Sequence, residues 1–157
     1  MAERNSTYAR LAGDSYWTPQ WVYDALFEVE KFDRPWDCAP RDADFDFLDR
    51  AWAVREIATN PPYSLAQEFI WHSLHVTQAS SGKTAMLLPM AFDAANGRRT
   101  LFESHPFKAK YVITRRIRWE NLPQKKAGPS QNHAWFVWDW SYKGNPTLGY
   151  LPRVHDG

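Results

Sequence analysis

The amino-acid sequence predicts an α/β fold with helices on both faces of a mixed sheet. Segments with apolar residues at helical spacing alternate with short apolar runs bounded by proline or glycine, which is typical of α/β proteins. The last two apolar runs are joined by a loop instead of a helical segment, so we expect two antiparallel neighbours there. The 157 residues suit a single domain, 1–157, with residues 1–15 as a loose lead-in.

Three segments are predicted to be helical. Thr18-Pro19 starts the first, because a capping hydroxyl and a proline at the first helical position favour helix initiation. Ser64 and Gln67 resemble a capping box for the second. Asp93–Phe102 is the third, weakened by a glycine. The buried faces of the first two are predicted from apolar residues spaced three and four apart: Val22, Ala25, Leu26 and Val29, then Ala66, Phe69, Ile70 and Leu74.

Five short apolar runs are predicted to be strands. Prolines bound the first two, and the fifth is long, aromatic and apolar on both faces, as in a central strand. The tail after Tyr142 is expected to be turn-like. The five predicted strands are Arg34–Ala39, Glu56–Thr59, Thr84–Leu88, Tyr111–Thr114 and His133–Trp140.

Composition limits the class of protein. Nine tryptophans and an aromatic content of 16% predict an aromatic-rich core. The single cysteine, Cys38, excludes an internal disulfide and suits a reducing compartment. No apolar run is as long as a membrane span and Met1–Arg10 is no signal peptide, so we expect a cytoplasmic protein that does not enter a membrane.

Charge is unevenly distributed although the net charge is only +1. Acidic residues dominate from Asp24 to Glu56, and basic residues dominate from Arg98 to Lys126. A basic stretch of the chain is compatible with binding to a polyanion and equally with a charged surface exposed to solvent, and the charge pattern alone favours neither.

The turn Ala58–Ser64 carries the strongest chemical signal. It follows a predicted strand and precedes a predicted helix, the place where open α/β sheets bind ligands. An exocyclic amine on a purine has two N–H bonds, which the Asn60 side-chain oxygen and the Pro61 carbonyl can accept. Pro62 would fix that carbonyl, and Tyr63 would offer a stacking face worth ~1–3 kcal/mol per base.

Asn60-Pro61-Pro62-Tyr63 resembles motif IV of the amino-methyltransferases, above all the DNA adenine-N6 methyltransferases of small phage and prophage type. The resemblance implies a catalytic role for these four residues. It also implies transfer of a methyl group from S-adenosylmethionine to the N6 amine of a flipped adenine in double-stranded DNA. The expected setting is a bacterial or phage-infected cell.

Further segments are similar to the same family, from about Tyr16 to Tyr142. Tyr16-Trp17-Thr18-Pro19 resembles the segment that lies against the methionine part of S-adenosylmethionine, and Trp36-Asp37-Cys38-Ala39 resembles the start of motif I. Asp46-Phe47-Leu48 looks like the stretch that contacts the cofactor's adenine. The cofactor-binding residues that the resemblance implies are Tyr16, Thr18, Pro19, Asp37, Cys38, Asp46 and Phe47.

One departure from the family leaves alternatives open. The family's glycine-rich turn is replaced here by Pro40-Arg41-Asp42, and the chain between Asp37 and Asp46 is too short for a strand and helix. The resemblance therefore implies a reduced, Rossmann-like class I methyltransferase sheet with an antiparallel C-terminal strand. This departure leaves open a catalytically degenerate module that binds DNA or a partner, for instance in anti-restriction. An RNA adenine or protein glutamine methyltransferase is the further alternative, because the same tetrapeptide is found in those enzymes.

Residues after the fourth predicted strand are candidates for DNA contact. Basic side chains would hold phosphates and amides of the following loop would reach base edges. A charged hairpin connection is the competing interpretation. A chain this small, without a separate recognition domain, is expected either to act promiscuously or to use a homodimer or partner subunit. The proposed DNA-contacting residues are Arg115, Arg116, Arg118, Lys125 and Lys126.

No metal site is expected. The acidic cluster at Asp37, Asp42, Asp44 and Asp46 lacks the glycine and terminal glutamate of a calcium loop. His72 and His75 have no third ligand at a suitable spacing, and surface histidines are far commoner than metal ligands. Ser80–Thr84 lacks the leading glycine of a phosphate loop and precedes a strand.

Overall fold

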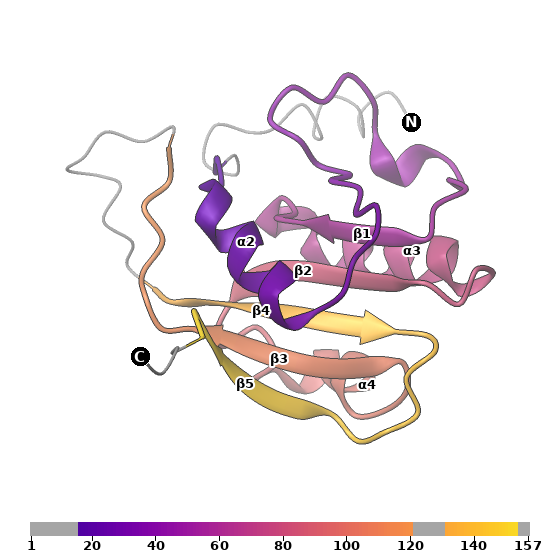
Figure 1. The fold of residues 1–157 in the computed structure, drawn as a ribbon. Coiled ribbons are helices and arrows are strands. Elements are labelled where there is room, and N and C mark those ends of the chain that lie inside the picture. Colours follow the sequence, from indigo (N-terminus) through magenta and orange to yellow (C-terminus); the bar gives the residue numbers. More distant parts are fainter. Residues whose placement is uncertain (1–15, 121–130, 154–157) are drawn as a thin grey trace.

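A computed structural model describes residues 16–120 and 131–153 as a five-stranded mixed sheet with helices on both faces (Figure 1). The strand order is β1-β2-β4-β3-β5. β1 is parallel to β2, β4 runs antiparallel to both of its neighbours, and β3 is parallel to β5. The strands are β1 (Glu56–Thr59), β2 (Lys83–Pro89), β3 (Phe107–Ile113), β4 (His133–Asp139) and β5 (Thr147–Leu151).

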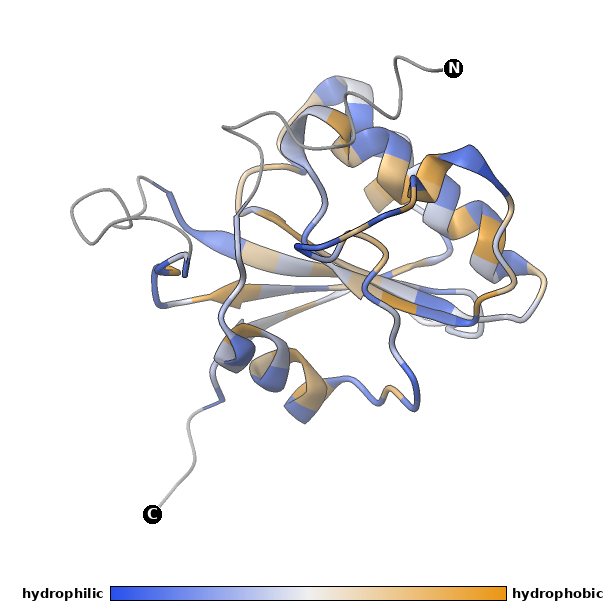
Figure 2. Ribbon diagram, turned by 90° about the horizontal axis from the view of Figure 1, so that it is seen from above, coloured by the Kyte–Doolittle hydropathy of each residue, from blue (hydrophilic) through white to orange (hydrophobic). Residues whose placement is uncertain are grey.

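The helices divide between the two faces of the sheet. Helix α2 (Gln20–Val29) covers one face, and α3 (Ala66–Gln78) with the short α4 (Arg99–Phe102) covers the other, as Figure 2 shows from above. Three 3₁₀ turns complete the described structure, at η1 (Phe47–Asp49), η2 (Tyr63–Leu65) and η3 (Asn96–Arg98).

Strand β4 is the centre of the core, because every one of its residues is buried. Its side chains alternate between the two faces, with Phe136 and Trp138 packed on the α3 side and Trp135 and Val137 on the α2 side. The indole N–H of Trp135 donates to the carbonyl of Val22 at 3.0 Å, and that of Trp138 donates to the carbonyl of Leu101 at 2.8 Å. Each tryptophan therefore fills the core and fixes one helix against the sheet.

Several predicted elements are confirmed with small changes of boundary. The strand predicted at Glu56–Thr59 is β1, and the antiparallel pairing of the last two predicted strands is the β3–β4 pair. The predicted cap of α2 is wrong, because the helix begins at Gln20 and Pro19 takes the N-cap position, where no side chain caps the helix. The Thr18 hydroxyl accepts a hydrogen bond from Asn60 instead. The α-helical part of the second predicted helix begins at Ala66, after the 3₁₀ turn η2.

Three expectations were wrong. The strand predicted at Arg34–Ala39 is reduced to one parallel bridge between Trp36 and Ile57. The predicted helix at Asp93–Phe102 forms only η3 and α4, because Ala95 is extended at φ −144° and ψ 128°. The tail after Tyr142 is not merely turn-like, since it contains the edge strand β5. The predicted lead-in at 1–15 lies outside the described residues.

Among the described residues, none of the helices combines the length and the apolar character that a membrane crossing needs.

Candidate functional site

The turn after β1 lies beside a cleft at the carboxyl end of the sheet. The cleft has a volume of about 250 Å³. Three elements contribute to it: the start of α2, the segment after Trp36, and the turn after β1. Its lining residues are Tyr16, Trp17, Thr18, Gln20, Tyr23, Asp37, Ala39, Pro40, Arg41 and Asn60. Three of the predicted cofactor residues and the predicted catalytic asparagine therefore share one cavity.

The side chain of Asn60 is held in one orientation. Its Nδ2 donates to the main-chain carbonyl of Tyr16 at 3.3 Å and to the hydroxyl of Thr18 at 3.1 Å. Within the described part of the chain, its Oδ1 is buried and has no hydrogen-bond partner. A buried acceptor without a partner is unfavourable, commonly by ~1–3 kcal/mol, unless a ligand supplies a donor. The oxygen that the sequence assigned to the target amine is thus the one left without a protein donor.

Asp37 joins the two chain segments that form the floor of the cleft. Its Oδ1 accepts hydrogen bonds from the hydroxyl of Thr59 at 2.6 Å and from the main-chain N–H of Ala39 at 3.0 Å. The Trp36–Ile57 bridge lies immediately before these contacts. Asp37 and Asn60 are therefore fixed side by side at the ends of two parallel segments.

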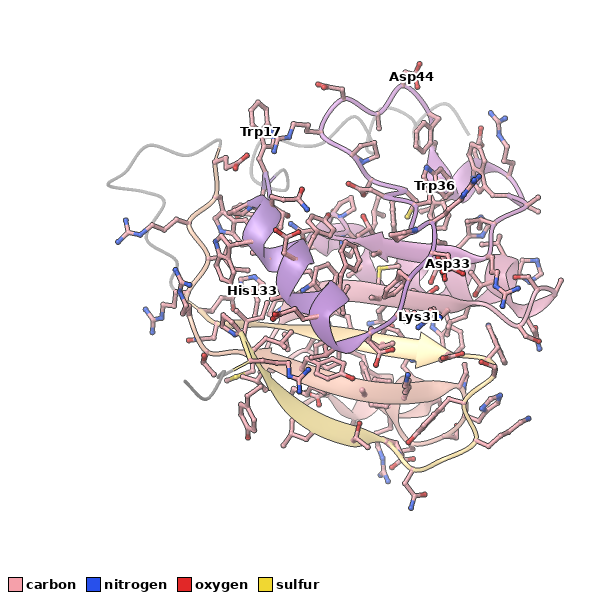
Figure 3. All side chains as sticks on the ribbon, in the orientation of Figure 1. Trp17, Lys31, Asp33, Trp36, Asp44 and His133 are labelled. Carbon is pink, nitrogen blue, oxygen red and sulfur yellow. The ribbon has the colours of Figure 1, made fainter. Side chains whose placement is uncertain are left out.

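Aromatic rings surround the turn. The Tyr63 ring lies 5.5 Å from Tyr16 and stacks on His133 at 6.0 Å with an interplanar angle of 23°. Trp119 packs against both Tyr16 and His133, at 5.2 and 5.1 Å. Figure 3 places Trp17, at the start of α2, and His133, at the start of β4, at the same end of the molecule. Such a cluster offers flat surfaces for a base.

The prediction did not single out His133, which contacts the predicted stacking residue directly. The Tyr63 hydroxyl is hydrogen-bonded to Nε2 of His133. Burial lowers the pKa of His133 from 6.5 to about 4, and the opposing effect of the Gln131 main chain is smaller. The imidazole is therefore neutral at pH 7, so Nε2 is able to accept a hydrogen bond from the Tyr63 hydroxyl. The signal in the sequence was a histidine at the head of a strand whose next five residues are all apolar.

Four of the predicted cofactor residues lie outside the cleft. Phe47 is fully buried and packs on Phe69 at 5.2 Å. Asp46 is 4% exposed, and its Oδ1 accepts the main-chain N–H of Leu48 at the start of η1. Cys38 is fully buried, and Pro19 is buried beneath the start of α2. None of these four residues lines the cleft.

The predicted DNA-contacting arginines are exposed on the segment that follows β3. Arg115 lies over the Trp21 ring at 4.8 Å, and Arg116 donates to Asn132 at 3.4 Å. The same segment reaches the cleft, where the N–H of Glu120 donates to the carbonyl of Trp17 at 3.0 Å. Lys125 and Lys126 lie outside the described residues.

A second polar cluster lies at the opposite end of the sheet. The carboxylate of Glu30, 3% exposed, accepts hydrogen bonds from Lys108 at 2.9 Å and from the Tyr111 hydroxyl at 2.6 Å. Burial, together with the hydrogen bond to Glu30 and its charge, raises the pKa of Tyr111. All charges in this cluster have partners, so we interpret it as structural. No group of three or more potential metal ligands occurs in the described ranges, 16–120 and 131–153.

Comparison with known proteins assigns no family to the chain, because no family model matches it and a search of the curated proteins finds no relative.

Proposed function

We propose that this chain is an S-adenosylmethionine-dependent methyltransferase that acts on the N6 amine of adenine in DNA. The observation that carries the proposal is the Asn60 side chain, whose Nδ2 is anchored twice while its buried Oδ1 has no donor among the described residues. An amide held in this way presents an acceptor and no donor to a ligand. That is the property that recognition of an amino group requires.

The chain's own residues supply the acceptor side of the reaction. Asn60 Oδ1 and the carbonyl of Pro61 would accept the two N–H bonds of the amine, which moves its nitrogen toward tetrahedral geometry and frees the lone pair. Tyr63, supported by His133, would stack on the base. Because Oδ1 is closed to solvent, neighbouring side chains must move before a base can reach it.

The donor side is supported by the composition of the cleft. When bound, S-adenosylmethionine supplies a methyl group on a sulfonium sulfur. Tyr16, Thr18 and Asp37 line a cavity that also contains Asn60, so a ligand there would lie beside the amine site. In doubly wound sheets the ligand crevice lies at the carboxyl ends of neighbouring parallel strands, and the paired ends at Asp37 and Thr59 have this arrangement. We propose accordingly that the sheet is a reduced Rossmann-like class I methyltransferase sheet.

A degenerate module that binds DNA without transferring a methyl group is the second candidate. It is favoured by the absence of a glycine after Ala39 and by the positions of Asp46 and Phe47 outside the cleft. A volume of about 250 Å³ is also small for a complete cofactor, because ligand pockets usually have volumes of ~300–1,000 Å³.

The test is transfer of tritiated methyl groups from S-adenosylmethionine to unmethylated plasmid DNA, to RNA and to a glutamine-containing peptide. The RNA and peptide arms are needed because a primary amide presents the same two N–H groups as adenine. We expect transfer to DNA, and we expect Asn60→Ala to reduce it about a hundredfold or more, as removal of an oriented transition-state interaction does elsewhere.

The matched control is Asn96→Ala, which removes an exposed amide distant in sequence from the turn and should leave transfer unchanged. Asn60→Ala should change the free energy of unfolding by only about 1 kcal/mol, because the loss of both Nδ2 hydrogen bonds is offset by removal of the buried Oδ1 without a donor. Wild-type activity in Asn60→Ala would remove Asn60 from the mechanism. DNA binding without transfer by the wild type would favour the degenerate module.

A further inference from the structure

Arg41 is a cation in the cleft whose partner is weakly held. Its Nη2 forms an ion pair with Oε1 of Glu120 at 2.8 Å, and the two side chains are 42% and 48% exposed. The guanidinium also lies over the Trp17 ring at 4.5 Å. Ion pairs as exposed as this one contribute little to stability, so a carboxylate from a ligand can replace Glu120 at small cost.

The cleft also contains the opposite charge. Asp37 lines it, with Oδ1 fixed by Thr59 and Ala39. A cavity that presents one carboxylate, one guanidinium and the neutral polar group of Thr18 is complementary in sign to a zwitterion. The volume of about 250 Å³ suits an amino-acid group better than a whole nucleoside conjugate.

We propose that Arg41 is the receptor for the α-carboxylate of a ligand whose amino-acid group enters this cleft, taking the place of Glu120, with the α-ammonium group toward Asp37. The inference rests on the proposed function, because the methionine part of S-adenosylmethionine is such a group. In this proposal Arg41 binds the carboxylate, and Arg41 lies in the segment Pro40-Arg41-Asp42, where the family has its glycine-rich turn. Arg41 is suited to this role because a planar guanidinium can bind a carboxylate through two parallel hydrogen bonds.

Isothermal titration calorimetry with two related ligands tests this assignment. S-adenosylhomocysteine and 5′-methylthioadenosine share the nucleoside and the thioether, but only the former has the amino-acid group. We expect the wild type to bind S-adenosylhomocysteine at least tenfold more tightly. Arg41→Gln should weaken that binding about tenfold through removal of a charged hydrogen-bonding partner, without affecting 5′-methylthioadenosine. Glu120→Gln should strengthen binding of S-adenosylhomocysteine severalfold, because the competing carboxylate is gone.

Two matched variants control for the change of charge. Arg50 lies over Trp52 at 4.6 Å as Arg41 lies over Trp17, but does not line the cleft, and Glu103 forms an exposed ion pair with Arg99. Arg50→Gln and Glu103→Gln should bind both ligands as the wild type does. If the wild type binds both ligands and Arg41→Gln still prefers S-adenosylhomocysteine as strongly as the wild type does, the assignment of Arg41 is wrong and the proposed function stands. If the wild type binds neither ligand, the cofactor half of the proposed function fails together with this inference.

Discussion

Two buried polar side chains at the carboxyl end of the sheet, Asn60 and His133, have their orientations set by named neighbours. Asn60 is anchored by Tyr16 and Thr18, and His133 is hydrogen-bonded to Tyr63 and packed by Trp119. The sequence predicted the role of Asn60 because twin prolines and an aromatic ring follow it. It offered no comparable signal for His133, whose hydrogen bond with Tyr63 joins residues 70 positions apart.

Stability should depend on pH through His133. Its folded pKa of about 4 lies below the unfolded value of 6.5, so between these values the unfolded chain binds more protons. The contribution of neutral His133 to the free energy of unfolding is therefore complete above about pH 6.5. It is lost as the pH falls from 6.5 toward 4, and the total loss is about 3 kcal/mol. Urea unfolding at intervals from pH 8 to pH 4.5 measures it.

His133→Phe is the variant that isolates this effect. It should be less stable than the wild type at pH 8, since the hydrogen bond between the Tyr63 hydroxyl and Nε2 of His133 is lost, yet its stability should fall less between pH 6.5 and 4.5. His75→Gln, at an exposed position on α3, is the control and should keep the wild-type slope. Equal slopes for His133→Phe and the wild type would show that another group titrates.

At the scale of elements, the turn between α3 and β2 is constrained both by its backbone conformation and by a close contact. Ser81 has a positive φ of 52°, and a Cβ added to Gly82 would lie 1.9 Å from the main-chain oxygen of Arg55. That oxygen accepts the N–H of Lys83 at 3.0 Å, so the clash is with backbone that is fixed in place. Position 82 requires glycine because the Arg55 oxygen leaves no room for a Cβ. Position 81 favours glycine because its φ is positive.

Opposite effects are therefore expected at two adjacent positions. Ser81→Gly should raise the free energy of unfolding by about 0.5–1 kcal/mol, because glycine adopts a positive φ without strain. Gly82→Ala should lower it by several kcal/mol, or prevent folding, because the backbone must shift. Thermal unfolding of both variants is the measurement, and Gly97→Ala, where an added Cβ meets nothing within 4 Å, is the control. A Gly82→Ala protein as stable as the wild type would mean that this turn is less tightly packed than the structure indicates.

Elements were predictable where local signals were sufficient. β1, β2 and β4 are apolar runs bounded by breakers, and α2 and α3 have apolar residues at helical spacing. β5 was missed because Gly149 interrupts it and its exposed residues include Leu148 and Tyr150. Among the described strands, its only partner is β3, far back in the sequence. Pairing across such a separation depends on tertiary packing, which local propensity does not encode.

At the scale of the whole molecule, the strand order brings distant segments to one end of the sheet. β4 runs antiparallel between β2 and β3, so its first residue, His133, meets the carboxyl ends of the parallel strands. The antiparallel neighbours were predictable from the loop that joins them. The insertion of β4 between β2 and β3 was not, because no local feature of the sequence specifies which edge a returning strand takes.

The exposed arginines after β3 lie on the same segment that reaches the cleft. If Arg115, Arg116 and Arg118 hold DNA phosphates, removing each arginine should reduce the slope of log K against log salt concentration by about 0.9. We therefore expect a triple alanine variant to lower the slope by about 2 to 3 and to weaken binding similarly on unrelated DNA sequences. Fluorescence anisotropy with labelled duplexes at several salt concentrations measures both quantities.

The control for this experiment must remove the same charge from another part of the surface. Arg34, Arg50 and Arg55 are exposed, and none of them lines the cleft. Arg34 donates its main-chain N–H to Glu56, and Arg55 directly precedes Glu56, at the end of β1 away from Asn60. Their triple alanine variant changes the net charge equally, and it should change the slope by less than a single phosphate-binding arginine would. Equal slopes for the two triple variants would show that attraction to DNA is a property of net charge. A specific decrease at Arg115, Arg116 and Arg118 would instead tie DNA binding to the end of the sheet where Asn60 and the cleft lie.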